Sequence, residues 1–268
     1  MTAPFITVTT SKDFISASSE GDFALIFGGL LIVIILGYFV CQNISYRRQG
    51  KDSLTEKEKI KELRQTIILL WSLCAIALIA WFQSDRGLQQ LGFTLNGTTE
   101  SMMAFAIVTI FCGYMIWQIF QVDKSQENKR DLLKQFETSG DFQSLRFVSK
   151  TGYWHFQAVA VTAGITEEII FRAFAITALS LYMPIWAATI IAGSIFVISH
   201  SYQGLKGMMR TIPITIVFTI LFLVTNSLIP VIILHIVVDI VAGILLWKAA
   251  QFENGLRDKQ KLATTARE

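Results

Sequence analysis

Residues 163–174, AGITEEIIFRAF, place Glu167, Glu168 and Arg172 in a stretch that is otherwise apolar, with long hydrophobic runs on both sides. A charged group at the centre of a bilayer costs roughly 3 kcal/mol or more on insertion scales. Three such groups within six residues are therefore hard to reconcile with a surface that faces lipid. We expect these side chains to face inward, to pair and to take part in chemistry.

The composition is that of a membrane protein. Of 268 residues, 53% are hydrophobic and 16% are charged, whereas soluble domains carry about 25% charged residues. We predict an all-α fold, a polytopic transmembrane helical bundle with seven spans, or eight if one long span is divided. The seven candidate spans are residues 23–41, 66–82, 102–120, 152–183, 184–201, 211–226 and 228–247.

The spans divide the chain into three regions. Residues 1–150 form an N-terminal membrane region with three spans and cytoplasmic connectors, residues 151–250 form a core, and residues 251–268 form a polar tail. The N-terminus lacks a basic region before the first apolar run, so we expect that run to be an uncleaved anchor. The three cysteines, Cys41, Cys74 and Cys112, lie in separate apolar runs and indicate small buried residues rather than disulfides.

Lysine and arginine placement predicts the orientation. The connector over 42–65 carries seven basic residues and the stretch over 121–150 carries six, whereas the connector over 83–101 carries only Arg86. The positive-inside rule then places the N-terminus outside and the tail in the cytoplasm. We expect the segments 51–64 and 122–147 to form cytoplasmic surface helices.

The fourth span is long for a single crossing. As a continuous helix, residues 152–183 would reach roughly 45 Å, against a hydrocarbon core of about 30 Å. We expect it to be tilted, or broken near Gly164 or before Pro184.

The spacing of the charges predicts two different roles for the glutamates. Glu168 and Arg172 are four residues apart and share a helix face, where they can form an ion pair. Glu167 has no local partner, and in a dry environment it is suited to act as a general base. A purely structural ion cluster that locks helices together explains the same three residues.

Two histidines occur in later spans. His200 ends FVISH, with Phe196 one turn earlier on the same face, and His235 begins HIVVD, with Asp239 one turn later. A His–Asp pair at this spacing can meet directly or ligate one ion. His155 has no such partner, and we expect it to be structural.

Inward-facing Glu, His and Asp side chains from three helices can surround one water. A base and an imidazole that activate water describe amide hydrolysis, and the same residues can bind a divalent metal. A cation-coupled transporter also uses intramembrane carboxylates, although no inverted repeat is present.

The three motifs EEIIFR, FVISH and HIVVD, in this order and in apolar spans, resemble the CPBP family of intramembrane proteases. This family contains the type II CAAX prenyl endopeptidases and the bacterial Abi, or bacteriocin-processing, proteins. The resemblance covers about residues 160–243. The first three spans resemble no family that we can name.

The resemblance implies specific roles. Glu167 and His200 would activate the attacking water, and His235 and Asp239 would stabilise the oxyanion or help to bind water or metal. Glu168, Arg172 and Phe196 would support them. If a metal is bound, its ligands would be Glu167, His200 and His235, with Asp239 as a further candidate. Zinc would be the expected ion. The alternative is a metal-free glutamate mechanism. Position 239 is Asp rather than Asn, and an ionised Asp cannot donate a hydrogen bond to an oxyanion.

We therefore predict an intramembrane endopeptidase of a bacterial inner membrane. Its expected partners are the lipid bilayer and a membrane-associated peptide or protein substrate, with no nucleic acid. The alternatives are a non-catalytic membrane scaffold or bacteriocin-immunity protein that retains the motif, and a cation-coupled transporter.

Overall fold

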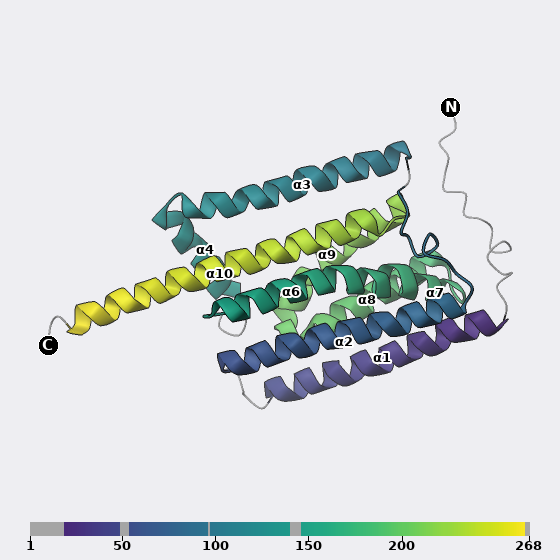
Figure 1. Cartoon of the computed structure of the whole chain (residues 1–268), viewed down its shortest axis with the longest axis horizontal. Coiled ribbons are helices and arrows are strands. Elements are labelled where there is room, and N and C mark those ends of the chain that lie inside the picture. The colour runs from purple at the N-terminus through teal and green to yellow at the C-terminus, as the bar shows by residue number, and fades with distance from the viewer. Residues whose placement is uncertain (1–18, 49–53, 96, 140–145, 266–268) are drawn as a thin grey trace.

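The protein is a bundle of long helices that lie side by side (Figure 1). The computed structural model describes residues 19–48, 54–95, 97–139 and 146–265, and no strand occurs in these ranges. The prediction of an all-α polytopic bundle is confirmed. The elements are α1 (Ser19–Arg48), α2 (Glu56–Gln83), α3 (Thr99–Asp123), α4 (Gln126–Ser139), α6 (Lys150–Glu167), the π-helix η1 (Glu168–Ala175), α7 (Ile176–Ser180), α8 (Ile185–Ser199), the 3-10 helix η2 (His200–Gln203), α9 (Gly204–Thr225) and α10 (Ile229–Thr265).

Five stretches among the described residues are long and apolar enough to cross a membrane, namely Asp22–Cys41, Glu56–Gln83, Thr99–Asp123, Ile185–Thr225 and Ile229–Thr265. The number differs from the expected seven for two reasons. The fourth expected span is divided into α6, η1 and α7, and α8 and α9 form one apolar stretch although the chain reverses between them. Gly193 of α8 faces Thr215 of α9, and Gly204 at the turn has φ +76°.

The outer faces of the bundle carry large apolar side chains. On α3, Ile107, Ile110 and Trp117 are each more than half exposed, and on α9 the same holds for Ile216 and Ile220. Contiguous exposed apolar surface of this kind is costly in water and suits contact with lipid tails. The protein is an integral membrane protein.

Helix α2 begins earlier than expected because of a capping box. Thr55 accepts a hydrogen bond from the Glu58 backbone N–H, and the Glu58 carboxylate accepts one from the Thr55 N–H. Residues 56–64 are therefore the first turns of α2 rather than a separate surface helix, and residues 51–53 lie outside the described ranges. Helix α4 occupies the second expected surface helix, within 122–147.

Helices α6 and α10 pack antiparallel and very close together. A Cβ at Gly164 would lie 2.5 Å from Ile236 Cγ1 and 2.9 Å from the Ile236 backbone nitrogen, and a Cβ at Gly243 would lie 2.7 Å from Gln157 Nε2. Small residues at such crossings allow two backbones to approach. No break occurs at Gly164, because α6 continues through it to Glu167. The other expected position is confirmed, since α7 ends at Ser180, before Pro184.

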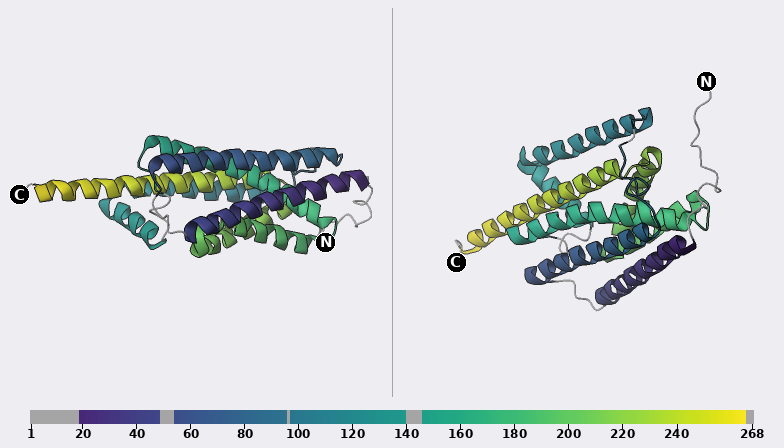
Figure 2. Two further views of the ribbon diagram at one scale, coloured as in Figure 1. Left: turned by 90° about the horizontal axis from the view of Figure 1, so that it is seen from below. Right: turned by 45° about the vertical axis from the view of Figure 1, so that its right-hand side comes forward.

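The remaining helices surround this pair (Figures 1 and 2). Helix α2 packs along α6 and against α1, whereas α3 and α4 pack on α10. The tail expected from residue 251 onward continues α10 as helix to Thr265. Ala249 and Ala250 of α10 form a second small core with Leu132 and Leu133 of α4. The buried residues Glu168, Arg172 and His235 lie where η1 and α10 meet α8 and α9.

Candidate active site

The innermost part of the site is a buried cluster of three ionisable side chains. Glu168 Oε1 accepts a hydrogen bond of 2.9 Å from Arg172 Nη1 and lies 2.6 Å from His235 Nδ1. Glu168 is fully buried and Arg172 is 2% exposed. The predicted Glu168–Arg172 pair is present, and it bridges η1 to α10 through His235. Because Glu168 Oε1 contacts both Arg172 and His235, the cost of burying these polar groups is shared within the cluster.

Aromatic rings enclose the guanidinium group of Arg172. Its Cζ atom lies 4.3 Å from the ring centroid of Phe196 and 5.4 Å from that of Phe218. The Phe218 ring also lies 4.9 Å from the His235 ring. Phe196 has the supporting position expected for it, whereas Phe218 was missed, because an additional phenylalanine in an apolar span gives no sequence signal.

A π-helix begins at the second glutamate. Helix α6 ends at Glu167, and η1 covers Glu168–Ala175, in which every residue from Glu168 to Phe174 is buried. Such widened turns are rare and occur often at functional sites. Here the change in helical pitch falls between two adjacent glutamates that both approach His235. The sequence motif gave no indication of this change.

The second nitrogen of His235 faces the open side of the site. Nε2 lies 3.8 Å from Glu167 Oε2 and 3.5 Å from Asp239 Oδ2. Exposure rises outward, from 6% for the His235 side chain to 13% for Glu167 and 36% for Asp239. The expected approach of His235 and Asp239 therefore occurs, at ion-pair distance. Glu167 Oε2 makes no hydrogen bond to any described residue, because 3.8 Å exceeds hydrogen-bond length.

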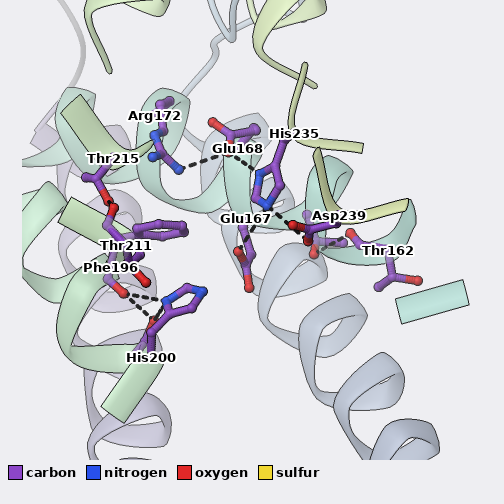
Figure 3. A network of polar contacts seen from close by, with 12 residues as sticks. Thr162, Glu167, Glu168, Arg172, Phe196, His200, Thr211, Thr215, His235 and Asp239 are labelled. Carbon is purple, nitrogen blue, oxygen red and sulfur yellow. Dashed lines mark hydrogen bonds and ion pairs between the residues drawn. The ribbon is translucent and has the colours of Figure 1, made fainter. Parts of the chain in front are cut away.

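His200 lies just beyond the end of α8, in η2, and borders the site on another side (Figure 3). Its Nδ1 lies 2.8 Å from the carbonyl oxygen of Phe196. A carbonyl only accepts, so Nδ1 carries the proton, and in the neutral ring Nε2 has the free lone pair. The direct partner expected for Glu167 was His200, but within the described ranges the carboxylate makes its ion-pair contact with His235 instead. Figure 3 shows Glu167 between the two imidazoles.

The candidate metal ligands do not form a metal site in this arrangement. No three His, Cys, Asp or Glu side chains among the described residues converge as ligands of one ion. His235 Nδ1 is engaged by Glu168, and His200 Nδ1 by a backbone carbonyl, which leaves one nitrogen of each ring for other partners. Zinc binding by Glu167, His200, His235 and Asp239 stays a prediction from the sequence, and we derive no chemical step through a metal.

The fold and the site together define an all-α integral membrane protein with a buried carboxylate–imidazole cluster between its helices. The model of one protein family, described as type II CAAX prenyl endopeptidase Rce1-like, matches residues 149–241. This segment, about a third of the chain, contains every candidate site residue, and the match supports the resemblance of the motifs to the CPBP family. The match supports intramembrane protease activity in general, in a lipid bilayer and on a peptide substrate. Comparisons with curated proteins and with solved structures gave no match.

Proposed function

We propose that this protein is an intramembrane endopeptidase that hydrolyses a peptide bond of a membrane-associated peptide or protein, with Glu167 as the general base. The observation that carries this proposal is the contrast between the two glutamates. Each glutamate has one oxygen without a hydrogen-bond partner among the described residues. Glu168, however, is fully buried, and its other oxygen is bonded to Arg172 and His235. Glu167 bonds to neither of these residues and is 13% exposed, at the outer end of the same cluster. A base that must accept a proton from water needs such an oxygen.

Glu167 and His200 would act on the same water. The Nε2 lone pair of neutral His200 can accept one hydrogen of a water whose other hydrogen points to Glu167. Transfer of a proton to Glu167 gives a hydroxide, which adds to the carbonyl carbon of the substrate. Glu167 then returns the proton to the leaving nitrogen as the C–N bond breaks, so the products are one carboxylic acid and one amine.

His235 would stabilise the oxyanion of the tetrahedral intermediate. Its Nδ1–H is held by Glu168 Oε1 at 2.6 Å, which fixes the ring, and its Nε2 faces the open side of the site. With carboxylates at both nitrogens the ring can carry a proton on each, and Nε2–H can then donate to the developing oxyanion. In this proposal Asp239 orients His235 instead of donating itself, which resolves the presence of Asp at position 239.

We propose further that the protein lies in a bacterial inner membrane with its N-terminus outside and its C-terminus in the cytoplasm. The seven basic residues over 42–65 and the five after Leu246 support this orientation. In Figure 1 the start of α2 and the end of α10 lie at the same end of the bundle, as the rule requires.

A cleavage assay tests the proposal. Purified protein in nanodiscs is incubated with internally quenched transmembrane peptides and with a prenylated peptide of the type named for the matched family. We expect Glu167→Gln and His200→Gln to abolish cleavage, while Glu137→Gln, an exposed carboxylate of α4, leaves it unchanged. Wild-type rates in both site variants would refute the assignment.

The fully buried Glu168–Arg172–His235 cluster also fits a non-catalytic scaffold, since it joins η1 to α10. The same variants separate the two functions. A scaffold would tolerate Glu167→Gln, because this carboxylate makes no hydrogen bond in the described structure, and its cellular phenotype would follow folding stability rather than cleavage.

A further inference from the structure

A second polar site lies at the end of the bundle where α2 and α6 begin, away from the carboxylate–imidazole cluster. An open cavity of about 770 Å³ is lined there by the first turns of both helices. Its lining includes three cations of α2, Lys57, Lys61 and Arg64, together with Ser149 and Thr151 from the start of α6. These five residues, together with Glu56, Glu58 and Ile60, are the eight lining residues of what we call the α2–α6 cavity.

The two acidic residues of the cavity are already engaged. Glu56 accepts hydrogen bonds from the Ser149 backbone N–H at 3.1 Å and from its hydroxyl at 2.5 Å, and Glu58 forms the capping box with Thr55. Across the described ranges no carboxylate forms an ion pair with Lys57 or Lys61. These hydrogen bonds come from neutral groups and leave both carboxylates charged, so three cations and two carboxylates give the lining a net charge of +1, with Lys57 and Lys61 outside the ion pairs of the described residues.

Arg64 is held in place by a histidine that the proteolytic site does not use. Arg64 Nε donates to His155 Nε2 at 3.0 Å, and His155 Nδ1 donates to the Thr151 carbonyl oxygen, 2.8 Å away. The backbone thus fixes the neutral tautomer of His155, and His155 in turn fixes Arg64 through one nitrogen. The two terminal NH₂ groups of the guanidinium remain for an anion, in the fork geometry that matches phosphate.

The same face of α2 changes from basic to apolar toward the membrane. Positions 57, 61, 64, 68 and 71 follow a spacing of four and three residues and share one helix face. Ile68 is 66% exposed and Trp71 is 46% exposed. A ligand that combines a phosphate with an adjoining hydrocarbon chain can therefore contact the cations with one part and Ile68 and Trp71 with the other.

We propose that the α2–α6 cavity binds the headgroup of an anionic phospholipid, with Lys57, Lys61 and Arg64 on the phosphate and one acyl chain along Ile68 and Trp71. Charge complementarity and the adjoining apolar stripe favour a lipid over free phosphate, which would use only the cations. The α2 residues of the cavity precede the matched segment 149–241, whereas Ser149 and Thr151 lie within it. The cavity therefore lies between the N-terminal helices and the protease-like region. Its occupancy does not depend on catalysis.

Lipid binding is measured directly. Full-length protein is titrated in detergent with phosphatidylglycerol or phosphatidylcholine of identical chains, and bound lipid is quantified by native mass spectrometry. We expect phosphatidylglycerol to bind more tightly than phosphatidylcholine. Removal of each cation should lower the affinity for phosphatidylglycerol about fivefold, which corresponds to roughly 1 kcal/mol per basic residue near an anionic lipid. The test variant is Lys57→Gln with Lys61→Gln and Arg64→Gln.

The control variant removes the same three charges elsewhere, with Lys124→Gln, Lys259→Gln and Lys261→Gln, all exposed. It should keep the preference for phosphatidylglycerol, as should Lys57→Arg with Lys61→Arg. The single variant Lys61→Gln changes one exposed side chain, so its expected fivefold loss is measured without any risk of unfolding. Equal binding of both lipids, equal loss in test and control variants, or displacement of phosphatidylglycerol by excess inorganic phosphate would each overturn the proposal.

Discussion

The contact between Gly164 and Ile236 predicts a sharp effect of a single methyl group. Gly164 lies one turn before Glu168 on α6, and Ile236 follows His235 on α10, so their contact adjoins the Glu168–His235 bond. In Gly164→Ala the new Cβ would lie 2.9 Å from the backbone nitrogen of Ile236. The Ile236 side chain, at 2.5 Å, can rotate away, but the backbone nitrogen moves only if the helices separate.

The size of the effect follows from these distances. Ordinary contact begins at 3.4 Å, so α6 and α10 must separate by 3.4 minus 2.9, which is 0.5 Å. The same displacement would lengthen the 2.6 Å bond between Glu168 and His235 to 3.1 Å. Overpacking of a tight interior costs about 1–3 kcal/mol. A 1 Å misplacement of catalytic groups can cost about 100-fold in rate, so half of that shift should cost roughly tenfold.

A matched control isolates the contact from helix propensity. Gly113 lies within α3, and a Cβ there meets nothing within 4 Å. Gly113→Ala gains the same helix propensity as Gly164→Ala, about 1 kcal/mol. It does so without a steric clash, because no atom lies near the new Cβ. The two variants should therefore differ by about 1–3 kcal/mol in the free energy of unfolding, measured by chemical denaturation in detergent, and only Gly164→Ala should slow cleavage. Equal stability and equal cleavage in both would show that the α6–α10 contact does not hold the site together.

Three further predictions concern the site. Glu168→Gln removes the carboxylate bonded to Arg172 and His235, and should cost about 3–5 kcal/mol of unfolding free energy because it leaves a buried cation uncompensated; an unchanged denaturation midpoint would contradict this. Asp239→Asn keeps an acceptor oxygen beside His235 and should retain cleavage within about tenfold, whereas Asp239→Leu should lose about 10–100-fold; equal rates in these two variants would exclude an orienting role. The zinc expected from the sequence is tested by metal analysis: if Glu167, His200 and His235 bind zinc, purified protein should contain one zinc per chain, and His235→Gln should lose it; full cleavage by chelated, zinc-free protein would refute a metal mechanism.

The parts of the structure that depend on local pattern could be predicted from the sequence. Every expected span falls on helix, because runs of apolar residues about 20 long have few other stable forms in lipid. The pairing of Glu168 with Arg172 and the approach of His235 to Asp239 both follow from a spacing of four residues. The number of membrane-crossing stretches differs from the expected seven because α6, η1 and α7 divide the fourth expected span, and because α8, η2 and α9 form one apolar stretch.

Features that depend on contacts between distant residues could not be predicted in this way. Glu168 and His235 are 67 residues apart, and no spacing rule joins them. Gly164 was interpreted as a bend, although its role is to let Ile236 approach, which only the neighbouring helix reveals. Similarly, the π-helix could not be predicted, because its sequence has the pattern of an ordinary apolar helix. Phe218 contacts Arg172 only because α9 packs beside η1, which the sequence does not indicate.

The two adjacent glutamates reach opposite nitrogens of one imidazole, and this arrangement accounts for the different roles that we propose for them. Glu168 Oε1 contacts His235 Nδ1, while Glu167 Oε2 faces Nε2. A carboxylate that is already bonded to two donors is a poor proton acceptor, so in the proposed mechanism the inner glutamate fixes the ring and the outer one accepts the proton. Exchange of the two roles would require Arg172 to move to the open side, where it would lose the rings of Phe196 and Phe218. The order of roles along the chain is thus set by the single arginine four residues after Glu168.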